Sequence, residues 1–407
     1  MKKCVALVLV VVSLNVAAQR VSDSVWRSEV RTVSLTRDGI EGEPPVLTIG
    51  DGGKLVLRFD LMQASPRDLR CRIAHCNRDW QPDSLLPEEF MLGFDDESID
   101  NMQFSFTTNV DYINYWHTVP PTYGSFVASG NYSLTVYLRN NPDSVFLTRR
   151  FYVSEGAARV ATTLDRATAT GGLMQNQEVN VTVQPDQMCQ PQFLTVRVQQ
   201  NGRTDNLRTL TFSGYDRGAL AFSHRPENVF AGGNMFRFFD ISNIHSPMYN
   251  VQQIERYGGQ TFAMLRPLED RSRKPFSSDR ALMGGMKVNV YNRTNDATEA
   301  DYVWVNFSLP MERPLLGGSL HIVGALTDWA LDDRNLMEWN PRYKAYTARL
   351  FLKQGYYSYQ LLYKPVGETE GQTATLEGDH FETPNRYTVF VYLRLPSDRY
   401  DRLIMVK

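Results

Sequence analysis

Short runs in which apolar and polar residues alternate dominate this chain of 407 residues, and helical periodicity is rare. Side chains of a strand point alternately to its two faces, so alternation over a few residues predicts a half-buried strand. Gly, Pro, Asn and Asp separate the runs at the spacing typical of a β-sandwich. We therefore predict an all-β protein of tandem immunoglobulin-like, early-set β-sandwich domains. The clearest predicted strands span residues 54–60, 69–76, 103–107, 132–138, 146–153, 177–184, 193–199, 302–309, 320–323, 345–352 and 356–363.

The length of the chain predicts two or three domains, and composition changes at two places. The first change is the small, polar segment 154–158, and the second is 309–314, which carries two prolines. These boundaries predict an N-terminal β-sandwich with an aromatic loop (19–155), a middle β-rich domain (156–310) and a C-terminal early-set immunoglobulin-like domain (311–407). Within the middle domain, Asn201-Gly202 predicts a hairpin turn, because Asn and Gly tolerate positive φ best.

The first 18 residues have the features of a signal peptide. Lys2 and Lys3 precede an apolar segment at 4–16, and Val-Ala-Ala at 16–18 is a small-residue cleavage site. We therefore predict a signal peptide at 1–18 and an exported mature chain that starts at Gln19. No later segment reaches about 18 consecutive apolar residues, so no direct membrane span is predicted.

Charge and cysteine content narrow the class of protein further. The formal charge falls from −2 to −4 when Lys2 and Lys3 are removed, which gives no reason to expect nucleic acid as a partner. Three cysteines remain in the mature chain, namely Cys71, Cys76 and Cys189. If 69–76 is one strand, the first two lie about 16 Å apart on opposite faces. A disulfide between them is then excluded, and we expect no disulfide framework.

No grouping of residues predicts catalysis, a cofactor or a metal site. The six histidines stand singly, and Cys71 and His75 would share a strand face from which Cys76 points away. The Gly-x-Ser-x-Gly nucleophile elbow is missing, and the Gly-Gly pairs lack the lysine of a phosphate loop. Adjacent acids such as Glu88-Glu89 are typical of solvated loops, because glycosidase carboxylates come from separate elements. We therefore predict a protein that is not an enzyme.

The stretch from Cys71 to Tyr137 holds the most unusual residues, because a strand leads there into a long loop rich in Trp and Tyr. These aromatics either cover one end of the sandwich or form an apolar surface for a protein partner, since Tyr and Trp are enriched at binding hot spots. Without a catalytic set to support, a protein contact is the better functional hypothesis. The candidate partner-binding residues are Trp80, Tyr112, Tyr115, Trp116 and Tyr123.

The same stretch resembles a known family. Its strand ends in His75-Cys76 and continues into Asp-Trp-Gln-Pro at 79–82, and Phe-Ser-Phe-Thr at 104–107 and Ser-Gly-Asn-Tyr at 129–132 follow. This arrangement resembles the type IX secretion system plug proteins of the Bacteroidetes. The resemblance implies a periplasmic protein, monomeric apart from its complex, that binds the periplasmic end of the giant outer-membrane β-barrel translocon and seals it when no cargo is present. It implies no catalytic, cofactor or metal residues.

The C-terminal module has a second resemblance. A Gly324–Trp329 turn and a Gly-Tyr-Tyr-Ser-Tyr strand at 355–359 are similar to the glycogen-binding type of carbohydrate module. The alternative function is therefore a periplasmic or cell-surface carbohydrate-binding protein with Trp329 and Trp339 as its platform. A third hypothesis is a secreted cargo protein whose last module is a secretion signal. A hydrolase is the weakest hypothesis, because no acid and base are paired.

We expect all three mature cysteines to be reduced. Alkylation of the unfolded mature chain without reductant should add three labels to its intact mass. A mass that shows two fewer labels would mean that a disulfide is present.

Overall fold

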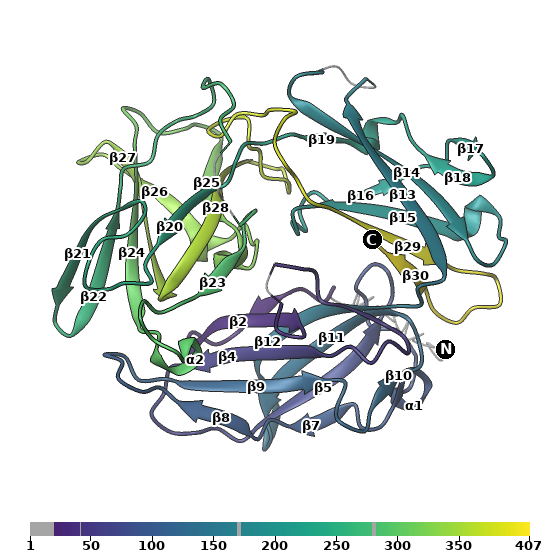
Figure 1. Ribbon diagram of the computed structural model, residues 1–407, viewed down its shortest axis with the longest axis horizontal. Coiled ribbons are helices and arrows are strands. Elements are labelled where there is room, and N and C mark those ends of the chain that lie inside the picture. Colours follow the sequence, from purple (N-terminus) through teal and green to yellow (C-terminus); the bar gives the residue numbers. More distant parts are fainter. Residues whose placement is uncertain (1–19, 41, 169–171, 279–281) are drawn as a thin grey trace, which may run out of the picture.

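The computed structural model describes residues 20–40, 42–168, 172–278 and 282–407, and the predicted signal peptide lies outside them. Figure 1 shows almost exclusively strands, arranged as three sandwich-like domains around a common centre. The all-β, tandem sandwich fold predicted from the alternating runs is confirmed. Within the described residues, no helix is long and apolar enough to cross a membrane.

The N-terminal domain packs two sheets against one another around a single hydrophobic cluster. Alternate residues of its strands enter that cluster, as Leu55, Leu57 and Phe59 do from one sheet and Cys71 and Ile73 from the other. The first sheet has the order β1-β12-β11-β5-β7, with β3 parallel to β12, and comprises β1 (Ser24–Val25), β3 (Val46–Thr48), β5 (Leu69–Cys76), β7 (Asp96–Ser98), β11 (Gly130–Leu138) and β12 (Asn141–Ser154). The second has the order β2-β4-β9-β8 and comprises β2 (Val30–Arg37), β4 (Leu55–Leu61), β8 (Asn101–Phe104) and β9 (Ile113–Val119). Helix α1 (Pro87–Phe90) leads into a small ribbon formed by β6 (Met91–Leu92) and β10 (Ser125–Phe126).

The second domain is a smaller sandwich whose core is rich in valine. Val181 and Val183 of one sheet meet Val196, Val198 and Val391 of the other. Its first sheet comprises β13 (Ala158–Arg166), β14 (Asn176–Pro185), β17 (Gly214–Asp216), β18 (Ala219–Phe222) and β19 (Val229–Ala231). Its second sheet comprises β15 (Leu194–Gln200), β16 (Arg208–Leu210), β29 (Tyr387–Leu393) and β30 (Arg402–Val406), and the 3-10 turns η1 (Pro191–Phe193) and η2 (Pro226–Asn228) lie in its loops.

The third domain is one nine-stranded sheet that folds over its own core. Val303 and Phe307 from one half of the sheet pack in the same cluster as Ile322 and Leu361 from the other half. Its strands are β20 (Arg237–Asp240), β21 (Val251–Tyr257), β22 (Gln260–Leu265), β23 (Met286–Val288), β24 (Tyr302–Pro310), β25 (Gly318–Val323), β26 (Leu336–Asn340), β27 (Ala345–Lys353) and β28 (Gly355–Pro365). Helix α2 (Asp296–Glu299) and the 3-10 turns η3 (Ala325–Thr327) and η4 (Asp333–Asn335) complete it.

Strand pairing differs from the predicted domain boundary at residue 310. It also differs from the prediction that the C-terminal domain extends to residue 407. The predicted linker at 154–158 does join two domains, since β12 ends at Ser154 and β13 begins at Ala158. Strand β24, however, ends at Pro310 in the middle of the third sheet, between β22 and β27. The last strands β29 and β30 return to the second domain, where β29 pairs with β15 along its whole length. The two prolines near 310 therefore mark a loop between strands of one sheet, and non-local pairing decides the domain division.

The Asn201-Gly202 turn forms as its residue types require. Both residues have positive φ, 54° and 77°, and the amide of Arg203 donates to the carbonyl of Gln200 at 3.0 Å. Strand β16 begins only at Arg208, so the turn starts a longer loop rather than a two-residue hairpin.

A buried ion pair joins the N-terminal domain to the third. Lys353 Nζ lies 2.6 Å from Asp60 Oδ2, and both side chains are almost completely buried. Tyr302 donates its hydroxyl to the same carboxylate at 2.7 Å, and Asn114 Nδ2 donates at 2.7 Å to its other oxygen. Burial lowers the pKa of Lys353, although Asp60 opposes that shift. The charge of this lysine therefore depends on a partner in another domain.

We expect Lys353→Met to destabilise the chain by about 3–5 kcal/mol, because the carboxylate of Asp60 would stay buried without its counter-charge. The double variant Asp60→Leu, Lys353→Met should recover part of that loss, because it leaves no unpaired charge. Urea unfolding followed by tryptophan fluorescence measures both. Equal losses in the single and double variants would contradict the role assigned to the pair.

Candidate functional site

The Asp-Trp-Gln-Pro loop that follows β5 is held by its own polar side chains. Asn77 Oδ1 accepts hydrogen bonds from the amides of Asp79 at 2.9 Å and Gln81 at 3.0 Å. Trp80 takes a positive φ of 64°, which turns its ring inward against Tyr152 at 5.3 Å and beneath the guanidinium of Arg150 at 4.7 Å. Trp80, one of the candidate partner-binding residues, is buried, so its side chain offers little surface to a partner in this structure.

The outer side of this loop meets the second domain instead. Arg197 of β15 donates to the carboxylate of Asp79 and to the carbonyl of Arg78, both at 2.5 Å. Arg78 in turn lies 3.2 Å from Asp401, which precedes β30. The position of Asp79 is therefore explained by an interdomain contact.

The Ser-Gly-Asn-Tyr turn at 129–132 lies at the same interface between the N-terminal and second domains. The amide of Leu403 donates to Ser129 Oγ at 3.0 Å, and Tyr392 donates its hydroxyl to Asn131 Oδ1 at 2.8 Å. Gly130 has a φ of 143°, and a Cβ at this position would lie 2.4 Å from His75 Nε2. Both the backbone conformation and the close approach of the His75 ring therefore require glycine here. The residues of this turn fasten the N-terminal domain to β29 and β30.

Two of the loop tyrosines are also structural. Tyr112 donates its hydroxyl to the carbonyl of Ala300 at 2.7 Å, and Lys353 Nζ lies 4.2 Å from the centre of its ring. Tyr115 stacks on Phe59 at 5.4 Å within the N-terminal core. Both side chains are buried, so these two candidates also offer little surface to a partner in this structure. A large aromatic side chain gains more by filling these contacts than by remaining in water.

The two remaining candidates differ in exposure. Trp116 is half-buried on the outer face of β9, where the Arg58 guanidinium lies 5.3 Å from its ring. Tyr123 is 96% exposed. Of the five candidate side chains, Tyr123 is the one that is free to contact a partner.

Tyr123 belongs to a small apolar surface, here called the ribbon face, which comprises Leu92, Phe94 and Tyr123. Ser125 pairs with Leu92 in the β6–β10 ribbon, and continuing that register places Tyr123 opposite Phe94. A Cβ built on Gly93 would lie 3.1 Å from the Cα of Gly124, which confirms how closely the two segments approach there. The carbonyl of Tyr123 is also close to that position, at 3.5 Å, so the segment with Tyr123 runs directly beside the segment with Leu92 and Phe94.

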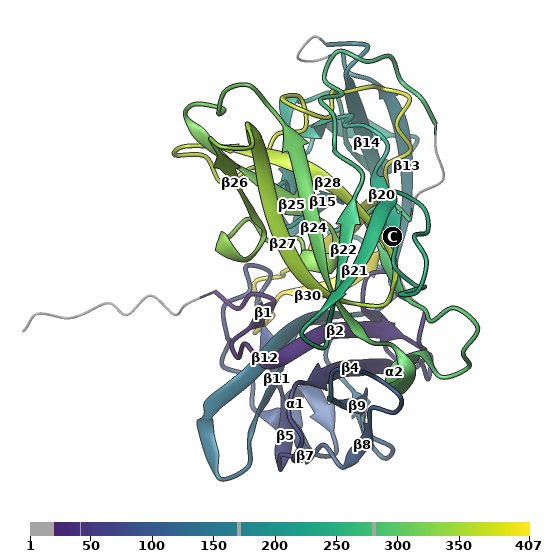
Figure 2. The same ribbon diagram turned by 90° about the vertical axis from the view of Figure 1, so that its left-hand side faces the viewer.

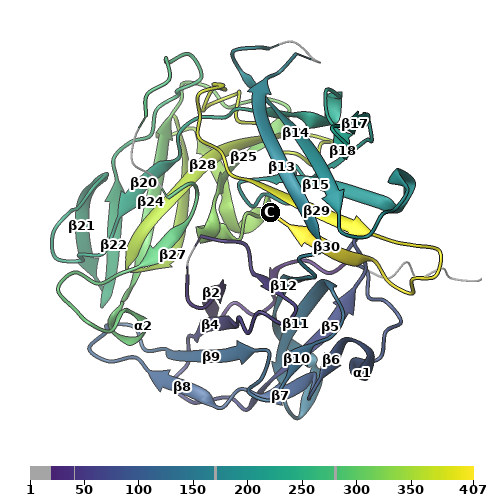
Figure 3. The ribbon, with the colours of Figure 1, turned by 45° about the vertical axis from the view of Figure 1, so that its right-hand side comes forward.

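The ribbon face is exposed because the other face of the ribbon enters the core. Met91 and Phe126 are buried in the N-terminal cluster, whereas Leu92 and Phe94 are 57% and 76% exposed. Figure 3 shows β6, β10 and α1, and Figure 1 shows β10 and α1, on the outer side of the N-terminal domain, away from the third domain. Contiguous exposed apolar side chains of this kind mark interaction sites. Leu92 and Phe94 were not among the residues predicted to bind a partner. The two large apolar residues around Gly93 could have indicated an exposed turn with apolar side chains.

The alternative glycan platform is not an open surface. Trp329 is half-buried beside Phe236, with ring centres 6.1 Å apart, and lines a cavity of about 270 Å³ at the junction of the three domains. Trp339 is also half-buried, and its indole donates to the carbonyl of Met311 at 3.3 Å. The two rings have different neighbours and do not form a joint platform.

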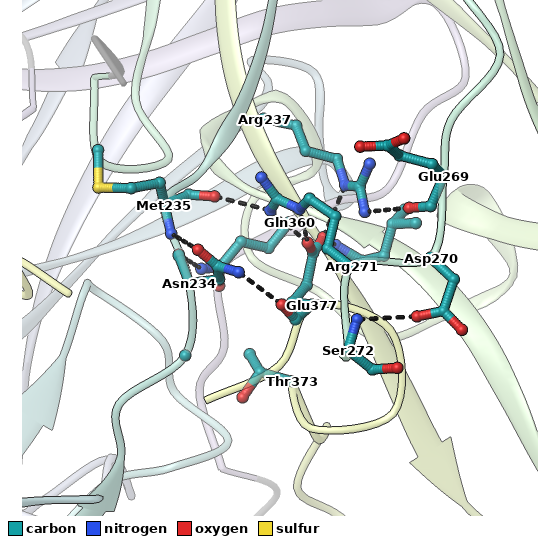
Figure 4. Close-up of polar contacts among 12 residues, drawn as sticks. Asn234, Met235, Arg237, Glu269, Asp270, Arg271, Ser272, Gln360, Thr373 and Glu377 are labelled. Carbon is teal, nitrogen blue, oxygen red and sulfur yellow. Dashed lines mark hydrogen bonds and ion pairs between the residues drawn. The ribbon is translucent and has the colours of Figure 1, made fainter. Parts of the chain in front are cut away.

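The third domain contains a buried carboxylate that resembles a catalytic group. Glu377 is fully buried and accepts hydrogen bonds from Arg237 Nε at 2.9 Å, Arg271 Nε at 2.8 Å and the amide of Leu361 at 2.8 Å (Figure 4). Burial alone would raise its pKa, but the two arginines outweigh burial and lower the pKa. Its own carbonyl accepts from Asn234 Nδ2 at 2.6 Å. With both oxygens engaged by the protein, Glu377 ties three loops together and has no free position for a substrate.

The thiols are similarly enclosed. Cys71 and Cys76 are buried free cysteines, and Cys189 is a free cysteine that is half-buried. Burial raises the pKa of Cys71, and raises that of Cys76 to about 11. Both thiols therefore stay protonated near neutral pH, which makes them poor nucleophiles. In the described part of the chain, no group of three or more His, Cys, Asp or Glu side chains could hold a metal ion.

These features define a class: a multidomain β-sandwich protein whose signature residues join domains and whose N-terminal domain carries an exposed apolar face. Residues 30–155 match the first domain of the type 9 secretion system plug protein. The N-terminal domain is therefore that of the type IX secretion system plug family, as the motifs in 71–137 predicted, and this match supports a role related to type IX secretion.

A solved structure extends the similarity over the whole chain. The crystal structure of a hypothetical protein from Parabacteroides merdae is 28% identical and superposes with a TM-score of 0.92. The match covers 96% of this chain and 99% of that chain, so the arrangement of all three domains is shared. No curated protein matches the chain.

We expect Glu377→Gln to destabilise the chain by about 3–5 kcal/mol, because two arginines would remain buried without their counter-charge. Glu312→Gln is the matched control, since its ion pair with Lys344 is exposed and screened by water, so its loss should change the free energy of unfolding much less. The lowered pKa of Glu377 adds stability that is complete above its ordinary value of 4.5 and is lost as the pH falls through the folded value. Urea unfolding at several pH values should therefore show the difference from wild type shrinking in acid. A difference that persists unchanged at low pH would argue against this role.

Proposed function

We propose that this protein is a non-enzymatic periplasmic plug that binds the periplasmic end of the type IX secretion barrel and seals it when no cargo is present. The observation that carries the proposal is the match of residues 30–155 to the plug protein's first domain. The motifs that first suggested the family lie in this same domain.

The way the domains are joined supports this function. A plug has to resist deformation when it closes a wide pore. Each pair of domains in this chain is linked by polar contacts. Asp79 binds Arg197, Asp60 binds Lys353, and Arg203 of the β15–β16 loop donates to the carbonyl of Gly371, in the loop after β28, at 2.6 Å. Three domain interfaces, one between each pair of domains, hold the domains more firmly than linkers alone would.

The ribbon face supplies a docking surface of suitable chemistry. Tyr and large apolar side chains provide most of the binding energy in protein interfaces, and a few of them suffice for a standard interface of about 1,600 Å². The ribbon face lies on the domain that the family match covers. Glycan binding has no comparable support, because neither Trp329 nor Trp339 is exposed.

The test is co-purification from the native outer membrane. Tagged wild-type protein, extracted in mild detergent, should bring down a very large barrel protein. Replacing the ribbon face by Leu92→Ser, Phe94→Ser and Tyr123→Ser should reduce that yield about tenfold or more, because hot-spot losses exceed 1 kcal/mol each. Cells with this variant should also admit a large hydrophilic antibiotic that the wild type excludes.

Tyr257→Ser is the control, because Tyr257 is also largely exposed, at 84%, but lies on β21 of the third domain. It should leave both readouts unchanged. The docking proposal fails if wild-type protein never recovers a large barrel protein. The assignment of the ribbon face fails if both variants behave alike.

A further inference from the structure

The N-terminal domain has a second apolar feature, which lies on strand β8. This strand is the edge of the β2-β4-β9-β8 sheet, and all of its residues are exposed. Figures 1 and 2 place β8 at the outer edge of the N-terminal domain, where helix α2 of the third domain reaches the loop that follows β8. Only β9 pairs with β8 among the described residues.

The backbone of β8 offers free hydrogen-bonding groups at that edge. In an antiparallel pair, alternate residues direct their N–H and C=O groups toward the partner strand and away from it. The amide of Ser105 donates to the carbonyl of Tyr112, and the amide of Phe106 donates away from β9 to the carbonyl of Thr298. The same alternation directs the backbone groups of Met102 and Phe104 outward, along the open edge.

The side chains of the same residues form an apolar row. Met102 pairs with Tyr115 and Phe104 with Ile113, so both lie on the face that forms the core. The side chains of Met102 and Phe104 nevertheless remain 40% and 53% exposed, because β8 is the edge strand of its sheet and lies outside the hydrophobic core. Phe106 is exposed as well. Natural proteins usually blunt edge strands with charged residues, bulges or coverings, so an open edge with an apolar row is unusual.

Acidic residues flank the row. Asp100 precedes β8, and Asp111 follows the loop that returns to β9. Both are exposed, and neither forms an ion pair with an arginine or lysine in the described part of the chain. This edge therefore combines unpaired backbone groups, an apolar row and uncompensated negative charge.

We propose that β8 is a site of strand addition for a partner segment that alternates apolar side chains and carries lysine or arginine at its ends. The backbone groups select an extended strand, the row of Met102 and Phe104 receives its apolar side chains, and the acidic flanks favour basic ends. The same charges disfavour a second copy of this chain, because its own β8 would bring acidic flanks to acidic flanks. This surface is separate from the ribbon face, so the inference goes beyond the proposed function.

The probe is a short fluorescent peptide of alternating valine and threonine with lysine at both ends, added to the full mature chain. Fluorescence anisotropy should show saturable binding. A peptide with glutamate ends should bind more weakly, and a peptide with proline at its centre should not bind, because proline cannot extend the sheet. Raising the salt concentration should narrow the difference between lysine and glutamate ends.

Two variants of the chain test the location. Phe104→Lys removes an apolar side chain from the row and should weaken binding about tenfold. Gln103→Lys adds the same charge to the same strand on the opposite face, and should weaken it less than about twofold. Both side chains are exposed, so thermal unfolding should stay unchanged in each.

Four outcomes would overturn the inference: no saturable binding by the lysine peptide, equal binding of the proline peptide, equal effects of Phe104→Lys and Gln103→Lys, or a dimer in sedimentation that Phe104→Lys disperses. The last result would identify a second copy as the occupant. None of these results bears on recovery of the barrel protein through the ribbon face, so the two proposals fail separately.

Discussion

The return of β29 and β30 to the second domain is the constraint on which the architecture depends. Leu194 of β15 pairs with Leu393 of β29, after the chain has built the entire third domain. The third domain is thereby inserted between two parts of the second. The same returning strands carry Tyr392 and Leu403, which contact the N-terminal domain. The pairing of β29 with β15 therefore completes both the core of the second domain and its interface with the N-terminal domain.

The signature residues of the family have the composition of an active site but perform a different task. A histidine, an aspartate, a serine and two aromatics lie close together, which invites a catalytic interpretation. In the structure each has a partner across a domain boundary or within the core. Asp79 binds Arg197, Ser129 accepts from the amide of Leu403, and Trp80 lies against Tyr152. Polar side chains that are engaged in this way stabilise the arrangement of the domains.

Local pattern predicted the strands well and the surroundings of individual side chains poorly. The predicted strand at 69–76 is β5, because its alternation reflects one buried and one partly exposed face. Burial of Trp80, Tyr112 and Tyr115 was not predictable, since an aromatic residue in a loop suits both a core and an interface. The partner that buries Tyr112 lies in the third domain, far away in sequence. For the same reason the boundary near 310 was misplaced, because no local signal records that β24 pairs with both β22 and β27.

The inserted third domain also has a consequence for the order of events in the cell. While the chain is synthesised from its N-terminal end, the second domain cannot close its core until β29 has been made. The partners of Asp79 and Asn131 in the second domain are therefore not all in place before nearly the whole chain exists. A partly synthesised chain presents an unfinished domain interface and an incomplete sheet. The topology thus acts as a check on completeness, in which only a full-length chain reaches its final shape.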